Sequence, residues 1–397
     1  MVEISIPMMQ KTALNERHRR LGAKMTDFHG WEMPLYYTSI LEEHQAVRQA
    51  LGVFDISHMG QVLVTGPDAL RTLNSLMTSD ISQVGEGRAC YTLILNERGG
   101  ILDDLIVYRI GAEDYLVIVN CGNRASDVEW FQAHRQGTVT VTDISQGRSI
   151  LAVQGPMACR VLEQILDARV TSLDRFGIAP IRTMGPAACI ARTGYTGGDG
   201  FELFLPDAHA LRLWDMLLSQ AKPFGAQPAG LGARDTLRVE GGLRLYGTDM
   251  DAATSPYEAG LRWVVAINKP GFLGKDALIA QRQQLARRAF VGFELSEGPV
   301  PRTGTELTVD SAPGGSGSGG RRVGVVTSGT FSPVLKKPLG MGYVDPAFTT
   351  PGTTLTMTVR SQRYAATVVK LPFWKGETKQ PALAPPRPAT ALEHLNP

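Results

Sequence analysis

The chain has 397 residues, and its 40 Lys and Arg nearly balance 38 Asp and Glu, which leaves a formal charge of +2 at pH 7. This balance, without a basic run or an aromatic-basic module, argues against a nucleic-acid partner. No stretch reaches the roughly 20 apolar residues that span a membrane, and residues 1–20 lack the apolar centre of a signal peptide. The length favours two or three domains, because a single hydrophobic core rarely grows this large.

Four cysteines stand far apart in the sequence, with no CxxC pair and no His at metal-ligand spacing: Cys90, Cys121, Cys159 and Cys189. Lone thiols of this kind fit a reducing compartment. We therefore expect a cytoplasmic protein without a metal site.

The first part of the chain predicts alternating helices and strands. Residues 15–24 are compatible with a helix. Residues 39–50 read as another helix, because Ser39 is a suitable N-cap, Glu42 follows three residues later, and Gly52 is a natural stop. Strands are then predicted at 53–56, 60–65, 90–95, 101–108 and 115–120. Helices are predicted at 67–77 and 125–136.

The second part predicts the same mixture and then changes character. Strands are predicted at 149–154, 188–193 and 201–205. Helices are predicted at 155–166, with Pro156 in its first turn, at 209–221 and at 231–240. From about residue 286 to 376 the chain shows short strands, Gly and Pro turns and almost no helix, which indicates an all-β unit. Within it, residues 310–320 read DSAPGGSGSGG and predict a long hairpin loop.

Two adjacent carboxylates, Asp103 and Asp104, lie in the middle of an apolar strand in GGILDDLIVYR. Side chains alternate along a strand, so the two acids should point to opposite faces, with Leu102, Ile106 and Tyr108 on the face of Asp104. An unpaired buried carboxylate is costly, so such an acid has a partner or a task. The alternative is an edge strand on which both acids are solvated.

Eight segments occur in the order and spacing of one family, the glycine cleavage system T-proteins or aminomethyltransferases. They are FHGWEMPLYY, GVFDISHMG, GGILDDLIVY, VNCGNR, RTGYTGGDGFE, GLGARDTLRVEGGLRLYGTDMD, GFLGKDAL and VTSGTFSPVLKKPLGMGYV. The resemblance runs from about Thr12 to Phe373 and so covers nearly the whole chain.

The resemblance implies an α+β fold of three domains, arranged as a cloverleaf around a central folate channel, with antiparallel sheets and a C-terminal β-barrel. We accordingly expect a folate-binding region at 1–285, a barrel domain at 286–376 and a Pro-rich disordered tail at 377–397. The first region should divide into two subdomains, one formed by 1–52 with 140–285 and the other by 53–139.

The family reaction implies two partners. An aminomethyl group arrives on the lipoyl arm of an H-protein, and its methylene passes to the co-substrate tetrahydrofolate. Ammonia is released, and 5,10-methylenetetrahydrofolate and dihydrolipoyl H-protein are the products. The resemblance implies no metal.

By resemblance, Asp104 is the catalytic carboxylate, which can orient the reacting folate nitrogens, move a proton and stabilise developing positive charge. Asp103 is then structural, either capping a neighbouring turn or pairing on the side of Arg109. Glu202 matches the glutamate that holds the pterin, since a carboxylate can accept two hydrogen bonds from the ring N–H and the amino group. Without the family, Glu202 would be an exposed acid at the head of a strand.

The resemblance also assigns Arg234 to the substrate site, and places Met59, Tyr91, Asn120 and Tyr195 along the folate pocket. Taken singly, Arg234 would be a surface helix residue paired with Asp235 or Glu240. Each of the other four would be a core or turn residue.

Three features depart from the family pattern. Gly198 stands where members commonly carry Glu, and Trp374 follows the C-terminal Pro-Phe where a Tyr is frequent. The Gly/Ser segment at 314–320 is longer than the usual hairpin.

Two relatives of the same fold offer alternative functions. One is a folate-dependent demethylase of a small sulfonium or ether substrate. The other is a non-catalytic folate-binding protein of the iron–sulfur maintenance type, whose hallmark is a Cys in a KGCYxGQE-like segment. The matching stretch here is KPGFLGKDA, with Phe272 in place of the Cys, which ranks this reading last.

Overall fold

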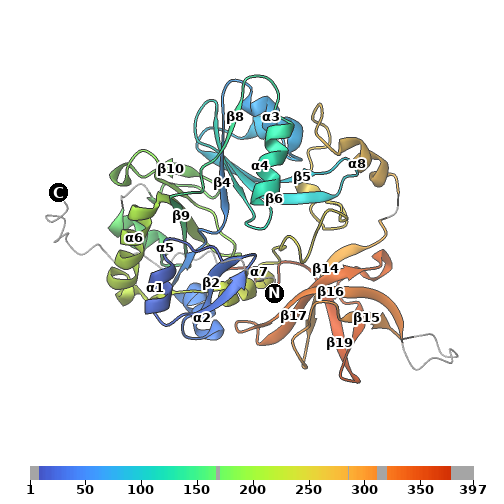
Figure 1. The fold of residues 1–397 in the computed structure, drawn as a ribbon. Coiled ribbons are helices and arrows are strands. Elements are labelled where there is room, and N and C mark those ends of the chain that lie inside the picture. Colours follow the sequence, from blue (N-terminus) through green and yellow to red (C-terminus); the bar gives the residue numbers. More distant parts are fainter. Residues whose placement is uncertain (1–8, 167–169, 285, 311–319, 377–397) are drawn as a thin grey trace, which may run out of the picture.

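Two sheets and a closed barrel organise the chain, as Figure 1 shows. The structure is a computed structural model that describes residues 9–166, 170–284, 286–310 and 320–376. A two-stranded ribbon, β1 (Lys24–Phe28) and β2 (Trp31–Tyr36), follows the short helix α1 (Asn15–Arg20). The predicted α+β fold with antiparallel sheets and a C-terminal barrel is confirmed.

The six-stranded sheet has the order β10-β11-β12-β9-β3-β13, and β13 pairs with β3 in parallel. Its strands are β3 (Leu51–Asp55), β9 (Arg148–Gln154), β10 (Ile178–Pro180), β11 (Cys189–Ala191), β12 (Gly200–Pro206) and β13 (Ala226–Pro228).

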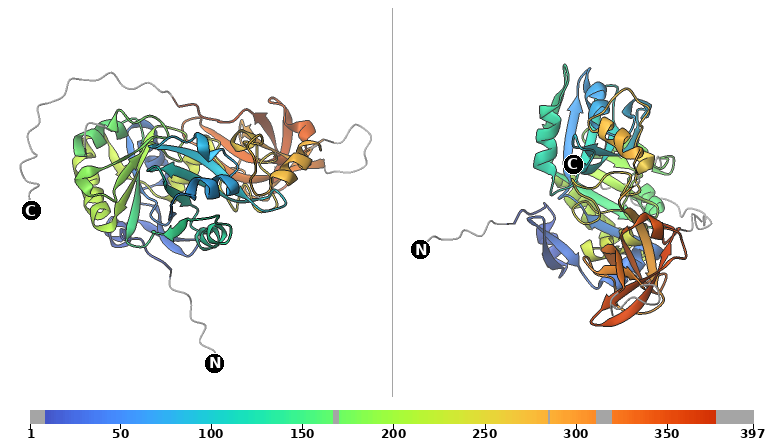
Figure 2. Two further views of the ribbon diagram at one scale, coloured as in Figure 1. Left: turned by 90° about the horizontal axis from the view of Figure 1, so that it is seen from above. Right: turned by 90° about the vertical axis from the view of Figure 1, so that its right-hand side faces the viewer.

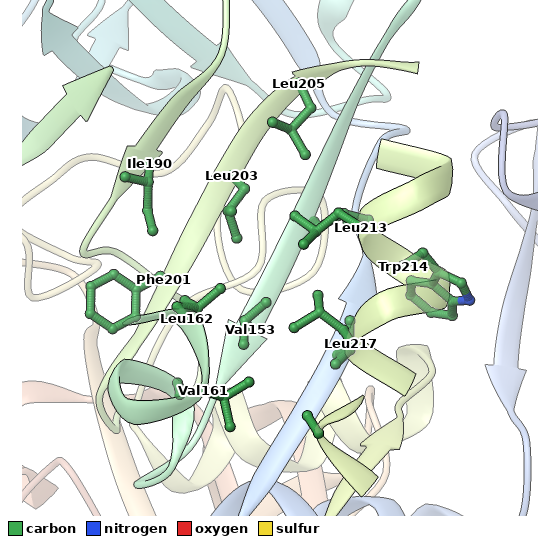
Figure 3. Packing of buried hydrophobic residues seen from close by; sticks show 14 of the residues in the cluster. Val153, Val161, Leu162, Ile190, Phe201, Leu203, Leu205, Leu213, Trp214 and Leu217 are labelled. Atoms are coloured by element: carbon green, nitrogen blue, oxygen red, sulfur yellow. The ribbon is translucent and has the colours of Figure 1, made fainter. Parts of the chain in front are cut away.

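Two helices, α5 (Ala158–Ile165) and α6 (Asp207–Gln220), cover one face of this sheet. The apolar residues of α6 recur at helical spacing, which places Leu213, Trp214 and Leu217 on the side that meets the strands. Figure 3 shows them packed against Val153 of β9 and Leu203 of β12. This cluster is the largest apolar core of the protein's described part.

The five-stranded sheet has the order β5-β6-β7-β4-β8, with helices α3 (Ala69–Leu76) and α4 (Arg124–Ala133) packed on its outer face. Its strands are β4 (Gly60–Thr65), β5 (Arg88–Leu95), β6 (Ile101–Arg109), β7 (Asp114–Val119) and β8 (Thr140–Asp143). The inner face meets the six-stranded sheet through a shared apolar cluster that includes Phe54, Tyr108 and Phe204.

The chain crosses from the six-stranded sheet to the five-stranded sheet after residue 55, where β3 ends, and crosses back after residue 143, where β8 ends. The predicted subdomain boundaries lay at 52/53 and 139/140. The division into domains itself remains a prediction.

The barrel closes in the order β14-β17-β16-β15-β18-β19. Its strands are β14 (Ala289–Leu295), β15 (Glu306–Val309), β16 (Arg321–Ser332), β17 (Lys337–Val344), β18 (Thr354–Val359) and β19 (Gln362–Val369). Seen from above in Figure 2, the barrel and the six-stranded sheet lie toward opposite ends of the molecule. The helix α8 (Lys275–Arg282) precedes the barrel.

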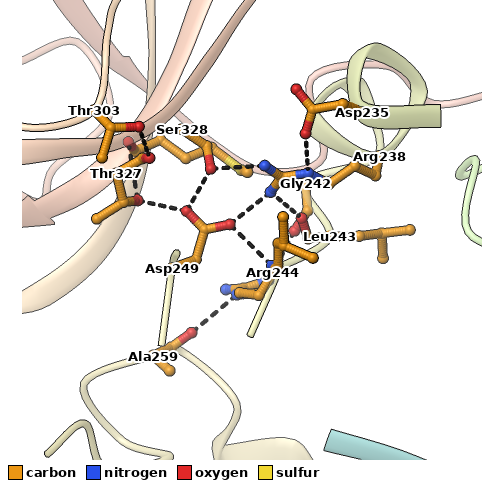
Figure 4. Close-up of polar contacts among 12 residues, drawn as sticks. Asp235, Arg238, Gly242, Leu243, Arg244, Asp249, Ala259, Thr303, Thr327 and Ser328 are labelled. Atoms are coloured by element: carbon orange, nitrogen blue, oxygen red, sulfur yellow. Dashed lines mark hydrogen bonds and ion pairs between the residues drawn. The ribbon is translucent and has the colours of Figure 1, made fainter. Parts of the chain in front are cut away.

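A buried polar network joins the barrel to helix α7 (Leu231–Glu240), as Figure 4 shows. Arg238 of α7 donates to Asp249 at 2.5 Å and to the Ser328 hydroxyl at 2.8 Å. Asp249 in turn accepts from Ser328 at 2.7 Å and from the backbone amide of Leu245 at 3.0 Å. The network therefore anchors the 243–249 segment between α7 and β16.

Helices α2 (Ile40–Gln49) and α5 each differ in one detail from the prediction. Helix α2 begins after the Ser39 cap as predicted, with Ser39 Oγ accepting from the amide of Glu42 at 3.2 Å. It ends at Gln49, however, and Gly52 lies within β3, where a Cβ would collide with Val47 of α2. Helix α5 begins at Ala158, so Pro156 precedes it rather than occupying its first turn.

Most of the predicted Gly/Ser loop, residues 311–319, and the predicted tail, residues 377–397, lie outside the described residues. The strands that flank the loop, β15 and β16, pair antiparallel. None of the helices within the described ranges combines the length and the apolar character of a membrane span.

Candidate active site

A cavity of about 1420 Å³ lies where the two sheets, α7, the 243–247 segment and the last described residues meet. Small-molecule pockets commonly measure about 300–1,000 Å³, so this one can hold a large ligand. Its lining includes all seven predicted site residues: Met59, Tyr91, Asp104, Asn120, Tyr195, Glu202 and Arg234.

Asp104 faces the cavity from the middle of β6. Its Oδ2 accepts a 3.0 Å hydrogen bond from the Tyr91 hydroxyl, and its Oδ1 accepts one of 3.0 Å from Asn120 Nδ2. Burial, followed by the negative charge of Asp103, raises the pKa of Asp104 to about 7. A carboxyl group with a pKa near neutrality can both take up and release a proton at physiological pH.

Asp103 points to the other side of the sheet and is fully buried. It accepts hydrogen bonds from the amide and Nδ2 of Asn120, at 3.0 and 2.8 Å, and from Asn123 Nδ2 at 3.0 Å. These contacts cap the turn that leads into α4, which is one of its two predicted roles. Arg109 instead donates to backbone carbonyls of neighbouring loops.

The predicted alternation along β6 is wrong at Leu102. The pairing with β5 runs from Asp103 opposite Ile94 directly to Ile101 opposite Leu95, so Leu102 is an extra, bulged residue. Leu102 consequently packs with Leu105 in the cluster under α3 and α4, on the face away from Asp104. Ile106 and Tyr108 lie on the face shared with the six-stranded sheet, as predicted.

Glu202 enters the cavity from β12 and is 8% exposed. Its Oε2 accepts from the Thr193 hydroxyl at 2.6 Å and from the Tyr108 hydroxyl at 3.3 Å. Among the residues described, its Oε1 accepts no hydrogen bond. The carboxylate is therefore held on one side and available to a ligand on the other.

Arg234 extends from α7 with its guanidinium 4.6 Å from the ring centre of Tyr195. Within the described ranges it forms no ion pair, because Asp235 pairs with Arg238 and Glu240 with Arg48. Burial lowers the pKa of Arg234, which reflects the cost of keeping this charge away from water. Tyr195 is fixed by a hydrogen bond from its hydroxyl to the backbone oxygen of Arg244.

His58 also lines the cavity, and sequence analysis did not single it out. It is 2% exposed, and its Nδ1 has no hydrogen-bond partner in the described part of the protein. Burial, followed by the charge of Arg234, lowers the pKa of His58 to about 3, so the ring is neutral. The available signal was its place beside Met59 in the GVFDISHMG segment.

An exposed tryptophan marks the rim of the cavity. Trp263, in the 3-10 turn η5 (Arg262–Val264), is 71% exposed and stacks on Tyr91 with ring centres 5.8 Å apart. Tyr91 is thus held between this indole and Asp104. Sequence analysis did not single out Trp263, because an isolated aromatic in a polar turn carries no spacing signal.

Two of the departures from the family pattern meet in space. A Cβ at Gly198 would lie 3.5 Å from the indole of Trp374, so a longer side chain there would run into the ring. The indole also lies against Arg48, whose guanidinium is 3.6 Å from a ring centre. Gly198 and the Trp374 ring therefore form one section of the cavity wall.

The cysteines and the potential metal ligands are scattered over the described residues. No group of three or more His, Cys, Asp or Glu there has the arrangement of a metal site, and the four cysteines are unpaired. Phe272, at the position of the iron–sulfur maintenance cysteine, is 7% exposed and packs in an apolar cluster with Leu278.

Comparison with known proteins gives concordant matches. The GCVT N-terminal domain matches residues 14–269, and the glycine cleavage T-protein C-terminal barrel domain matches residues 288–375. An aminomethyltransferase of Halothermothrix orenii is 42% identical over 365 residues, covering 92% of this chain and 100% of the relative. One of Rubrobacter xylanophilus is 43% identical over 383 residues, covering 96% and 98%.

A solved structure agrees with these matches. The crystal structure of glycine cleavage system aminomethyltransferase T from Bartonella henselae superposes with a TM-score of 0.85 at 35% identity, covering 93% of this chain and 99% of that one. The sequence, the two domain matches and the fold thus agree, and the chain belongs to the aminomethyltransferase family, the T-proteins of the glycine cleavage system.

Proposed function

We propose that this enzyme transfers the methylene of an aminomethyl group, carried on the lipoyl arm of an H-protein, to tetrahydrofolate. Family membership supports the reaction class. The observation that carries the proposal is the composition of the cavity: one carboxyl group able to exchange a proton near pH 7, a second carboxylate with a free oxygen, and an unpaired guanidinium.

The proposed chemistry balances without an oxidant or a metal. The methylene carbon gains bonds to N5 and N10 of the folate and loses its bonds to the lipoyl sulfur and the amine nitrogen. The two folate nitrogens release two protons overall, of which one ends on the sulfur and one on the departing ammonia. In this proposal Asp104, which lines the cavity, accepts one of these protons and returns it as a general acid–base group.

The binding roles follow from charge and hydrogen-bonding capacity. Glu202 can accept from the adjacent N–H and amino groups of a pterin through its free oxygen. Arg234, which has no ion-pair partner among the residues that the structure describes, suits an anionic or electron-rich group of the ligand, and Tyr195 offers a flat face beside it. Met59, Tyr91 and Asn120 complete the proposed pocket.

The proposed location of the protein is the cytoplasm. Unpaired cysteines and a near-neutral charge favour a cytoplasmic protein that works with a protein partner and a folate, without nucleic acid or membrane.

The deciding assay is folate-dependent ammonia release from aminomethyl-lipoyl H-protein. We expect release that requires tetrahydrofolate and fails with Asp104→Asn. Absence of release, together with methyl transfer from a small sulfonium or ether to folate, would support the demethylase instead.

A further inference from the structure

Three carboxyl groups gather beneath the cavity at the junction of β6 and α4. Asp103 is 0% exposed, Asp127 of α4 is 2% exposed, and Asp104 adjoins them on β6. Among the described residues, none of the three forms an ion pair with Lys, Arg or His. Three ionised carboxylates without a counter-ion in such a place would be strongly destabilising, so at least one must hold a proton.

The contacts show which acid holds it. The carboxyl groups of Asp127 and Asp103 lie within hydrogen-bonding reach of each other, and two buried carboxyl groups can share a hydrogen bond only if one of them supplies a proton. Asp103 receives three N–H donors from Asn120 and Asn123, a pattern that stabilises its ionised form. Asp127 Oδ2, by contrast, is buried and accepts from no N–H or hydroxyl group within the described ranges, a setting that favours the neutral acid.

We propose that Asp127 is a positioning residue that keeps its proton at neutral pH and uses it to donate a hydrogen bond to Asp103. Asp103, thereby held as an anion, orients Asn120 against Asp104 and sets the pH range in which Asp104 exchanges protons. Asn120 is the physical link, because its Nδ2 lies 2.8 Å from Asp103 Oδ1 and 3.0 Å from Asp104 Oδ1. The role of Asp104 rests on the proposed function, whereas the proton on Asp127 does not.

Burial raises the pKa of Asp103 as well, but hydrogen bonds from Asp127, Asn120 and Asn123 oppose that rise. The surroundings therefore favour the proton on Asp127. Burial and then the charge of Asp103 raise the pKa of Asp127 to about 10. The other titratable groups that bear on the three acids also have raised pKa values, chiefly through burial, and are neutral near pH 7: Tyr91, Cys121, Tyr195 and Tyr246. The cavity cations Arg234 and Arg244 interact with Tyr195 and Tyr91. Asp103 is then the ionised neighbour that acts on Asp104.

Substitutions at Asp127 and at Asp103 test separately the proton held by Asp127 and the negative charge of Asp103. Asp127→Asn is neutral and can still donate to Asp103, so kcat and its pH profile should stay close to those of the unaltered enzyme. Asp127→Leu has no donor and should lower kcat by about tenfold, part of the contribution of an oriented acid–base group. Asp103→Asn removes the charge, so the acid limb of the kcat profile should move to lower pH by about one unit.

If Asp127 were ionised, Asp127→Asn would itself move the limb to lower pH, and that result would overturn the proposal. An unchanged limb in Asp103→Asn would overturn it equally. A residue that served only stability would change the melting temperature without moving either profile.

A substrate-free measurement tests the proton directly. Infrared spectra of the unaltered protein at pH 8 should show the C=O band of one protonated carboxylic acid. This band should be absent from the Asp127→Asn variant and present in the Asp104→Asn variant. Spectra without that difference would refute the proton on Asp127, even if Asp127→Leu does not fold. Because no substrate is needed, this outcome is independent of whether the protein acts on H-protein and folate.

Discussion

The hydroxyl of Tyr91 donates a 3.0 Å hydrogen bond to Oδ2 of Asp104, while its ring stacks on the exposed indole of Trp263. A tyrosine at the rim of the cavity thus fixes the orientation of the carboxyl group within it. The neutral phenol donates a hydrogen bond to the ionised carboxylate, which opposes part of the rise in the pKa of Asp104 caused by burial and by Asp103.

The first prediction compares the two adjacent acids. Asp104→Asn should lower kcat by roughly a hundredfold or more, the range contributed by general acid–base groups, while tetrahydrofolate still binds. Asp103→Asn should lower kcat much less at its own pH optimum. Rates with saturating folate and loaded H-protein, measured beside thermal melts, check both. An inactive Asp103→Asn with an active Asp104→Asn would contradict the assignment.

The pH dependence of the unaltered enzyme follows from the same carboxyl group. If ionised Asp104 accepts the proton, kcat should decline as pH falls through about 7, where Asp104 becomes protonated. Most of the titration of one group falls within about one pH unit on either side of its pKa, so kcat is measured with saturating substrates from about pH 6 to pH 8. A kcat that stays constant over this range would argue against that role.

The third prediction concerns Glu202. In Glu202→Gln, the amide presents a donor where the pterin edge also offers donors, so tetrahydrofolate affinity should fall by roughly 1.5–3 kcal/mol, the value of a hydrogen bond to a charged group. Calorimetric titration measures the affinity, with Glu97→Gln as a matched control, because Glu97 is exposed and does not line the cavity. Equal affinity in both variants would remove Glu202 from the site.

Replacing Arg234 should increase the stability of the ligand-free protein and decrease its affinity for tetrahydrofolate. Its guanidinium is desolvated without an ion-pair partner in the described part of the chain, so Arg234→Met should raise the melting temperature of the ligand-free protein. The same change should weaken tetrahydrofolate binding. Arg212→Met, on the exposed side of α6, provides the control. A variant that melts lower and binds normally would show that Arg234 is structural.

The buried pair of His18 and Asp55 predicts a pH-dependent contribution to stability. Burial would raise the pKa of Asp55, but the hydrogen bond and charge of His18, 2.8 Å away, lower it below its ordinary value of 3.8. This contribution is complete above that value and is lost as pH falls through the lower pKa of the folded state.

Asp55→Asn should therefore destabilise the protein by roughly 3–5 kcal/mol at pH 7, the cost of breaking a buried pair. The difference from the unaltered protein should narrow below about pH 4. Urea unfolding at pH 7 and at pH 3.5 measures both values. A difference that is constant across this range would refute the linkage.

Several local features could be read from the sequence because they depend on neighbours along the chain. Helix α7 spans Leu231–Glu240 and strand β4 spans Gly60–Thr65, both with the predicted bounds, and Ser39 caps α2 through its own side chain. Caps, periodicity and turn residues act over a few positions. The family resemblance added the seven residues that line one cavity, although their separate roles remain predictions.

Tertiary packing decided the rest. Gly52 resembled a helix stop, yet the close approach of β3 to α2 requires a residue without a side chain there. The bulge at Leu102 depends on the register between β6 and β5, which alternation along one strand cannot reveal. In the sequence, Asp127 is only one acid near the start of a predicted helix, and the packing of α4 on β6 brings it against Asp103. The pKa of a buried carboxyl group depends on segments far along the chain, because they exclude water from it and share its proton.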